Sequence, residues 1–228
     1  MSAAFVTAQT AIATAPLVPE IRLHLATEIT PIWQATEDFL HQANIAPPFW
    51  AFAWPGSQAL ARHVLDTPAC VAGLRVLDFA AGGGLAAIAC VMAGAASVEA
   101  AEIDPMASAA TRLNAALNGV VLTVTTGDVV GADCRWDVIL CGDVCYEAPM
   151  TAHIMPWLQR MAADACVLVA DPGRNYLPDG MDALAVYDIA TSRELEDREI
   201  RQTVLYRLHA PALHSSQPDS FRPHDTVG

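Results

Sequence analysis

The sequence has 228 residues, of which 54% are hydrophobic and 16% charged, a composition that indicates one globular domain and excludes a chain that is disordered throughout. The formal net charge of −13 repels phosphate groups, and no basic stripe offsets it, so we expect no nucleic-acid partner. All twelve basic residues are arginine.

The cysteines and the first residues bear on the cellular setting. The six cysteines show no C-x-x-C spacing and lie mostly in apolar runs, which favours a reducing, cytoplasmic environment. Residues 1–18 contain no basic residue, so neither a secretory signal nor a transit peptide is expected. The uncharged run 79–98 is rich in Ala and Gly, which predicts a loop and a buried helix instead of a membrane span.

The chain divides into a lead-in, one domain and a tail. Residues 1–19 are rich in Ala, Thr and Pro and are expected to be weakly structured, whereas residues 20–42 have loosely helical spacing. We therefore predict a partly helical N-terminal segment at 1–46, a single domain at 47–209, and a flexible tail at 210–228.

Within the domain, strands and helices alternate, as in a parallel sheet built from βαβ units. Asp104 and Pro105 are typical of an N-cap and first helical residue, and Met106, Ala109, Leu113 and Leu117 share one face of the helix that follows. The last two strands are expected to form an antiparallel hairpin at one edge. The expected elements are a helix at 56–65, strand 74–79, helix 85–93, strand 97–101, helix 105–118, strands 120–125 and 136–141, helix 149–161, and strands 166–170, 183–190 and 202–208.

A glycine cluster follows the strand at 74–79, in the sequence Asp78-Phe-Ala-Ala-Gly-Gly-Gly84. Glycines between a strand and a helix let the backbone approach an adenosine-bearing ligand closely. The cluster fits the dinucleotide fingerprint of dehydrogenases, with Glu102 as the ribose ligand, and also the S-adenosylmethionine loop of methyltransferases. Asp78 at the strand end, the short chain that remains, and the antiparallel edge favour the methyltransferase.

Further motifs narrow this interpretation. The segment Pro48–Leu60, Glu102-Ile-Asp-Pro105, Gly142-Asp-Val-Cys-Tyr146 and Asp171-Pro-Gly-Arg174 resemble the protein-lysine methyltransferases that modify the electron transfer flavoprotein β subunit. The D-x-x-Y motif of Asp143 to Tyr146 is typical of that group. Bacterial relatives are also associated with methylation of the ribosomal stalk protein.

The resemblance implies a Rossmann-like, seven-stranded class I methyltransferase sheet, mostly parallel, with helices on both faces. It implies a cytoplasmic monomer that uses S-adenosyl-L-methionine to methylate a lysine-bearing protein, either the flavoprotein β subunit or the ribosomal stalk protein, without nucleic acid or membrane. Asp143 and Tyr146 would line the mouth where the lysine enters. The expected cofactor-binding residues are Trp54, Asp78, Ala80, Gly82, Gly84, Glu102 and Asp128.

These residues have expected roles and alternatives. Asp78 and the backbone of Gly82 and Gly84 would contact the methionine end, Glu102 the ribose, and Asp128 the adenine amino group. Ala80 takes the first glycine position of the pattern, where a methyl group is tolerated if φ is negative. Asp78 and Asp143 could instead be turn caps, and Trp54 and Tyr146 core aromatics.

Other functions remain open. A small-molecule, nicotinamide-like N-methyltransferase would need an enclosed pocket, for which the N-terminal segment could form a lid. A cofactor-binding module without catalysis is a further alternative. The scattered histidines show no metal-ligand spacing, and no Ser/His/Asp triad is evident, so no metal is expected.

Overall fold

The computed structural model describes residues 2–26, 48–191 and 198–210. A seven-stranded sheet with the order β5-β4-β3-β6-β7-β9-β8 lies at its centre. Five strands are parallel, whereas β9 pairs antiparallel with β7 and β8. The strands are β3 (Arg75–Phe79), β4 (Ser97–Glu102), β5 (Thr123–Thr126), β6 (Val138–Gly142), β7 (Cys166–Asp171), β8 (Asp182–Ala190) and β9 (Ile200–Leu208). The predicted fold class, with its antiparallel edge, is confirmed.

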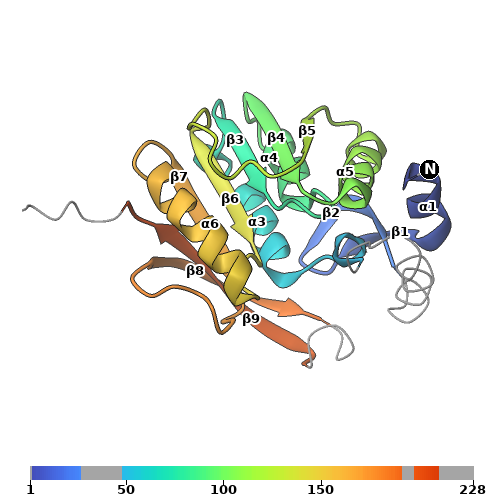
Figure 1. Cartoon of the computed structure of the whole chain (residues 1–228). Coiled ribbons are helices and arrows are strands. Elements are labelled where there is room, and N and C mark those ends of the chain that lie inside the picture. The colour runs from blue at the N-terminus through green and yellow to red at the C-terminus, as the bar shows by residue number, and fades with distance from the viewer. Residues whose placement is uncertain (1, 27–47, 192–197, 211–228) are drawn as a thin grey trace, which may run out of the picture.

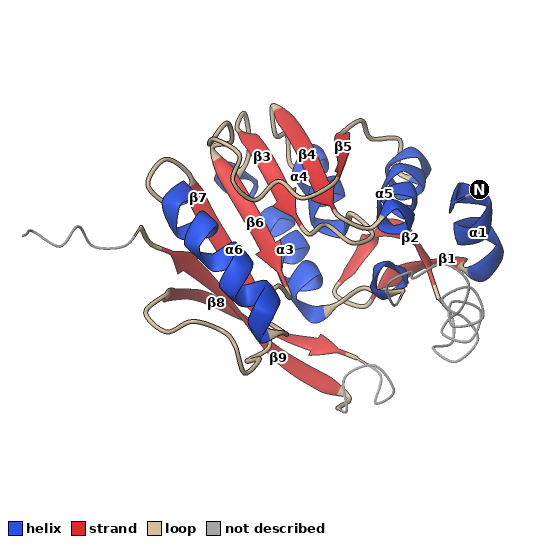
Figure 2. Cartoon of the chain, viewed as in Figure 1, coloured by secondary structure: helices blue, strands red, loops and turns tan. Residues whose placement is uncertain are grey.

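Helices cover both faces of this sheet (Figures 1 and 2). Alternate residues of the central strands pack on opposite sides: Leu140 belongs to the cluster under α3 and α4, whereas Ile139 belongs to the cluster under α6. This alternation in strands buried on both faces is typical of a doubly covered parallel sheet. The helices are α3 (Pro55–Asp66), α4 (Leu85–Met92), α5 (Pro105–Leu117) and α6 (Ala148–Met161), with short 3-10 turns η1 (Phe49–Ala51) and η2 (Pro68–Cys70).

Residues 2–25 differ from the prediction. Ser2–Gln9 forms helix α1, and β1 (Ala11–Ala15) pairs antiparallel with β2 (Val18–Leu25). The expectation of weak structure at 1–19, and of a helix from residue 20, is therefore wrong as far as residue 25. Ile21 and Leu23 alternate with exposed residues and are buried in the main core, so their burial stabilises a strand. Residues 27–42 lie outside the described residues, as does the expected tail from 211, and the domain boundaries stay predictions.

Helix α5 begins as predicted but buries a different face. The Asp104 carboxylate accepts a hydrogen bond from the Met106 amide at 2.7 Å, which confirms the N-cap. The expected face of Met106, Ala109, Leu113 and Leu117 is only partly buried. The fully buried residues are small or polar, and they include Ser108, Thr111 and Asn114. The Thr111 and Asn114 side chains contact the glycine loop, as described below.

Candidate functional site

The glycine loop connects β3 to α4 at the carboxyl edge of the sheet. Gly82 and Gly84 have positive φ angles of 53° and 78°, which favour glycine. A Cβ on Gly82 would meet no protein atom within 4 Å, whereas a Cβ on Gly84 would lie 2.6 Å from Cγ2 of Thr111. Gly82 therefore borders open space that a ligand can occupy, and Gly84 allows the loop to pack against α5. Gly84 does not line the cavity beside the loop.

Ala80 also has a left-handed backbone, with φ of 54°. A negative φ is expected at Ala80 from the sequence, and the structure corrects this. Ala80 therefore carries a Cβ at a backbone conformation that favours glycine. Ala80 lines the cavity, so its methyl group lies on the wall of the site.

Asp78 lies beneath the loop and is 3% exposed. Its Oδ2 accepts a hydrogen bond from the Ala87 amide at 2.9 Å, and burial raises its pKa to about 7. Asp78 does not line the cavity. The structure thus shows a carboxylate that holds the first turn of α4, and direct contact with a cofactor stays a prediction.

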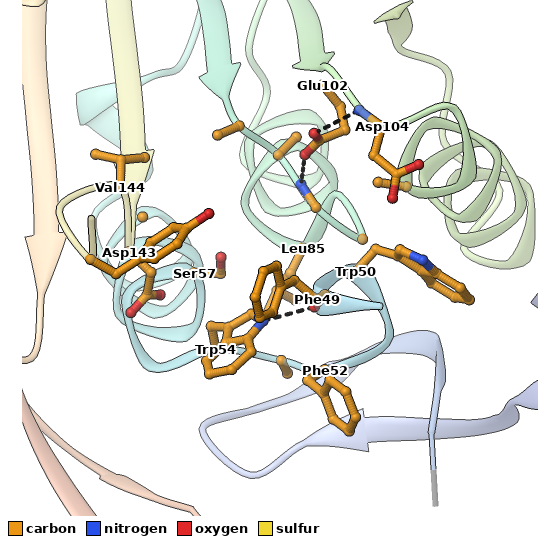
Figure 3. Close-up of a pocket in the computed structure, with 18 of the residues that line it drawn as sticks. Phe49, Trp50, Phe52, Trp54, Ser57, Leu85, Glu102, Asp104, Asp143 and Val144 are labelled. Carbon is orange, nitrogen blue, oxygen red and sulfur yellow. Dashed lines mark hydrogen bonds between the residues drawn. The ribbon is translucent and has the colours of Figure 1, made fainter. Parts of the chain in front are cut away.

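Glu102, at the end of β4, fixes the loop from the other side (Figure 3). Its carboxylate oxygens accept hydrogen bonds from the Gly82 amide at 2.9 Å and from the Asp104 amide at 3.1 Å. Burial raises the pKa of this carboxyl group, although both amides oppose the shift. Glu102 lines the cavity and offers a partly buried acceptor that suits ligand hydroxyl groups.

The cavity beside the loop has a volume of about 310 Å³, and its lining is mostly apolar with a few polar groups, as in small-molecule sites. Leu23 and Leu25 of the N-terminal hairpin form part of its wall. The structure brings six predicted site residues to this one cavity: Trp54, Ala80, Gly82, Glu102, Asp143 and Tyr146.

Aromatic side chains line the side of the cavity opposite Glu102 (Figure 3). The Trp54 indole donates to the Phe49 carbonyl at 2.7 Å. The Phe49 ring lies edge-on to Trp54 and to Tyr146, with centroid separations of 5.8 and 5.9 Å. Burial raises the pKa of the Tyr146 hydroxyl, although this side chain is still 37% exposed. The site residue Phe49 was not singled out from the sequence, although it lies in the Pro48–Leu60 motif.

Asp143 follows β6 and also has a positive φ, of 55°. Its Oδ2 accepts from the Gly56 amide at 2.6 Å, and its Oδ1 lies 3.3 Å from Nη2 of Arg174. The Arg174 guanidinium carbon lies 5.9 Å from the centroid of the Trp54 ring. Asp143 is therefore part of a polar network that joins the loop after β6, the first turn of α3 and the loop after β7 at the mouth of the cavity.

Asp128 is outside this arrangement. Its side chain is 50% exposed, accepts from the Val130 amide at 2.8 Å and pairs with His153 at 2.7 Å. It does not line the cavity, so its role toward adenine stays a prediction.

Two buried residues of α5 were missed in the sequence. The Thr111 hydroxyl donates to the Gly82 carbonyl at 2.8 Å, and the Asn114 side chain donates to the Gly83 carbonyl at 2.8 Å. Asn114 also accepts from the His24 amide of β2 at 2.7 Å. Polar residues inside a helix carry no signal of such contacts, because only the tertiary partner defines them.

The described residues contain no group of three or more His, Cys, Asp or Glu side chains placed to hold a metal ion. Over the same residues, no helix has the length and apolar character needed to cross a membrane.

The comparisons with known proteins find methyltransferases. The family model of ribosomal protein L11 methyltransferase (PrmA) matches residues 60–161. The electron transfer flavoprotein beta subunit lysine methyltransferase of Danio rerio is 34% identical over 207 residues, which cover 87% of this chain and 79% of that protein. The Xenopus laevis protein of the same name is 36% identical and covers 84% and 80%.

A solved structure shows the same fold at low identity. The magnesium protoporphyrin IX methyltransferase of Synechocystis PCC 6803, crystallised with bound S-adenosylmethionine, is 14% identical with a TM-score of 0.50. The match covers 77% of this chain and 96% of that one.

Proposed function

Because the chain belongs to the electron transfer flavoprotein beta subunit lysine methyltransferase family, we propose that this S-adenosylmethionine-dependent methyltransferase methylates lysine side chains of the electron transfer flavoprotein β subunit. The observation that carries this proposal is the shared cavity. It combines Gly82 and Glu102 on the side of the glycine loop with Asp143 and Tyr146 on the side of the D-x-x-Y motif.

The residues present fit the cofactor. The open space at Gly82 admits a ligand against the backbone, and the partly buried Glu102 carboxylate can accept hydrogen bonds from ribose hydroxyl groups. We assign Ala80 and Trp54 to the walls of the cavity around the bound cofactor. When bound, S-adenosylmethionine supplies a methyl group on a positively charged sulfur, and the protein has to align an amine with it.

The protein residues then act on the lysine. A free lysine has a pKa near about 10.4, and its ammonium must lose a proton before it can attack. The rings of Phe49, Trp54 and Tyr146 exclude water around the approaching side chain, and desolvation lowers the pKa of an amine. We assign Tyr146 and Asp143 to orienting the amine at the mouth.

A labelling experiment tests this assignment. The purified enzyme and labelled S-adenosylmethionine are incubated with an extract of cells that lack the gene. Because the enzyme contains no lysine, every labelled lysine found by mass spectrometry comes from another protein. Label on lysines of the flavoprotein β subunit supports the proposal, whereas label confined to small molecules supports a small-molecule N-methyltransferase and contradicts it.

One observation favours a second substrate. The ribosomal protein L11 methyltransferase model matches residues 60–161, a span that includes the glycine loop and the D-x-x-Y motif. We therefore propose the ribosomal stalk protein as an alternative substrate. Purified L11 and flavoprotein β subunit, supplied together at equal concentration, distinguish the two through the site of the label.

A further inference from the structure

Arg174 occupies the surroundings that the proposed function assigns to a substrate cation. Its guanidinium pairs with Asp143 at 3.3 Å and lies over the Trp54 ring at 5.9 Å from the centroid. All three residues line the cavity. The protein thus already places one positive charge between the carboxylate and an aromatic face that would otherwise attract the lysine ammonium.

The pair is held firmly on both sides. The carboxylate of Asp171 is fully buried, and its Oδ1 accepts from the Gly173 amide at 2.8 Å and the Arg174 amide at 2.7 Å. Asp143 is held by the Gly56 amide at 2.6 Å. The side chains of Arg174 and Asp143 are only 20% and 10% exposed, so salt and water screen their charges weakly.

The charge of Asp143 matters for the reaction. A carboxylate near an amine favours the charged ammonium and raises the pKa of that amine. The ammonium cannot attack, so an uncompensated Asp143 would slow methyl transfer while it strengthened docking. A guanidinium at hydrogen-bonding distance opposes this effect, because it repels the ammonium and cancels the field of the carboxylate.

We infer that Arg174 keeps the substrate lysine reactive by neutralising Asp143, so that the mouth orients the amine without stabilising its protonated form. This inference rests on the proposed lysine N-methylation. It makes Arg174 a positioning and charge-setting residue of the reaction, beyond a role in holding its own turn.

The other ionisable groups around the pair are mostly acidic. Burial raises the pKa of both Asp171 and Tyr146, and the charge of Arg174 opposes this rise in both. The charge of Arg201 also lowers the pKa of Asp171. Loss of the guanidinium would therefore leave an excess of negative charge at the mouth. Among the described residues, the ionisable groups that act on the pair or on its neighbours include Glu102, Cys145, Tyr146, Glu147, Asp171 and Arg201.

The test is the pH dependence of kcat from pH 6.5 to 10, at saturating S-adenosylmethionine and purified flavoprotein β subunit, because kcat reports ionisations in the bound complex. For Arg174→Gln we expect the rising limb to move to higher pH by about one unit, since a nearby charge shifts a pKa by about 1–3 units. At pH 7.5 this shift lowers kcat about tenfold. At pH 10 the activity of the variant should approach that of the wild type.

Two controls separate charge from structure. Arg174→Lys keeps the positive charge and should keep the midpoint of the rising limb. Arg135→Gln removes the same charge from a pair with Glu99, at the opposite end of β6 from Asp143, and should leave the profile unchanged. Calorimetric binding of S-adenosylmethionine confirms that each variant is folded.

The outcomes are distinguishable. A shifted limb in Arg174→Gln, with unshifted controls, supports the inference. A uniform loss of activity at every pH, or an unchanged profile, overturns it while the proposed function stands. If the wild type methylates no lysine of the β subunit at any pH, the proposed function fails and the inference fails with it.

Discussion

The carboxylate of Asp143 accepts a hydrogen bond from the backbone amide of Gly56 at 2.6 Å. This contact joins the loop after β6 to the first turn of α3. The approach is close, because a Cβ on Gly56 would lie 2.5 Å from Asp143 Oδ2 and from the Ala170 carbonyl. The motif after β6 and the motif before α3 are therefore one structural unit, although 87 residues separate them.

Gly56→Ala tests this unit. The added methyl group cannot fit beside the Ala170 carbonyl oxygen and Asp143 Oδ2, so we expect a loss of stability on the order of 1–3 kcal/mol. We also expect at least a tenfold loss of turnover. Urea unfolding and steady-state assays measure the two effects. Asp143→Asn keeps an acceptor for the Gly56 amide and serves as the control, with a smaller change in stability. Wild-type turnover in Gly56→Ala would contradict the close contact.

Asn114 couples the glycine loop to the N-terminal hairpin. Asn114→Ala leaves the Gly83 carbonyl and the His24 amide without this partner, which costs about 1–3 kcal/mol. We expect weaker S-adenosylmethionine binding by calorimetry and faster hydrogen exchange in β2.

Asn118→Ala is the matched control for Asn114, because Asn118 contacts Arg22 of β2 but not the glycine loop. It should loosen β2 and leave cofactor affinity within about twofold. Equal losses of affinity in the two variants would argue against a specific link through Asn114.

The alternation of strands and helices could be predicted from residue 56 onward, because each element has clear turn and cap signals. Asp104 and Pro105 are an example. The hairpin at 11–25 was missed, since the alternation around Ile21 and Leu23 is short and follows a segment rich in Ala and Thr. Thr111 and Asn114 were missed for a different reason: their burial depends on the glycine loop, which lies about 30 residues away.

The site was predicted in part for similar reasons. Gly82, Glu102, Asp143 and Tyr146 follow strands whose carboxyl ends meet at one edge, so the pattern could place them together. No pattern indicates that a distant Arg174 side chain pairs with Asp143.

Ala80→Gly should stabilise the protein. The left-handed φ of 54° costs a residue with a Cβ about 1–2 kcal/mol of stability. Glycine avoids this cost, but its greater freedom in the unfolded chain lowers the stability by about 0.5–1 kcal/mol. The expected gain in unfolding free energy is about 0.5–1 kcal/mol, measured by urea unfolding. Ala81→Gly, at a neighbouring position without a positive φ, should destabilise instead. A loss of stability in Ala80→Gly would contradict the assigned backbone.

Asp78 predicts a pH dependence of stability. Its folded pKa is about 7 against an ordinary value of 3.8, so the folded protein retains a proton that the unfolded chain releases. The stabilisation by this proton is complete below about pH 4 and is lost as the pH rises to about 7. Asp78→Asn removes this group, so the fall in unfolding free energy between pH 4 and 7 should become shallower. An unchanged slope would contradict the raised pKa.

We propose that the enzyme transfers a methyl group from S-adenosylmethionine, bound in this cavity, to lysines of the flavoprotein β subunit. The most direct measurement is mass spectrometry of purified β subunit after incubation with the enzyme and S-adenosylmethionine, with Gly82→Arg as the blocked control. For this proposal we expect added mass of one or more methyl groups, confined to lysines, with the wild type and none with Gly82→Arg. An unmodified β subunit with the wild type, under conditions where calorimetry shows the cofactor bound, would contradict it.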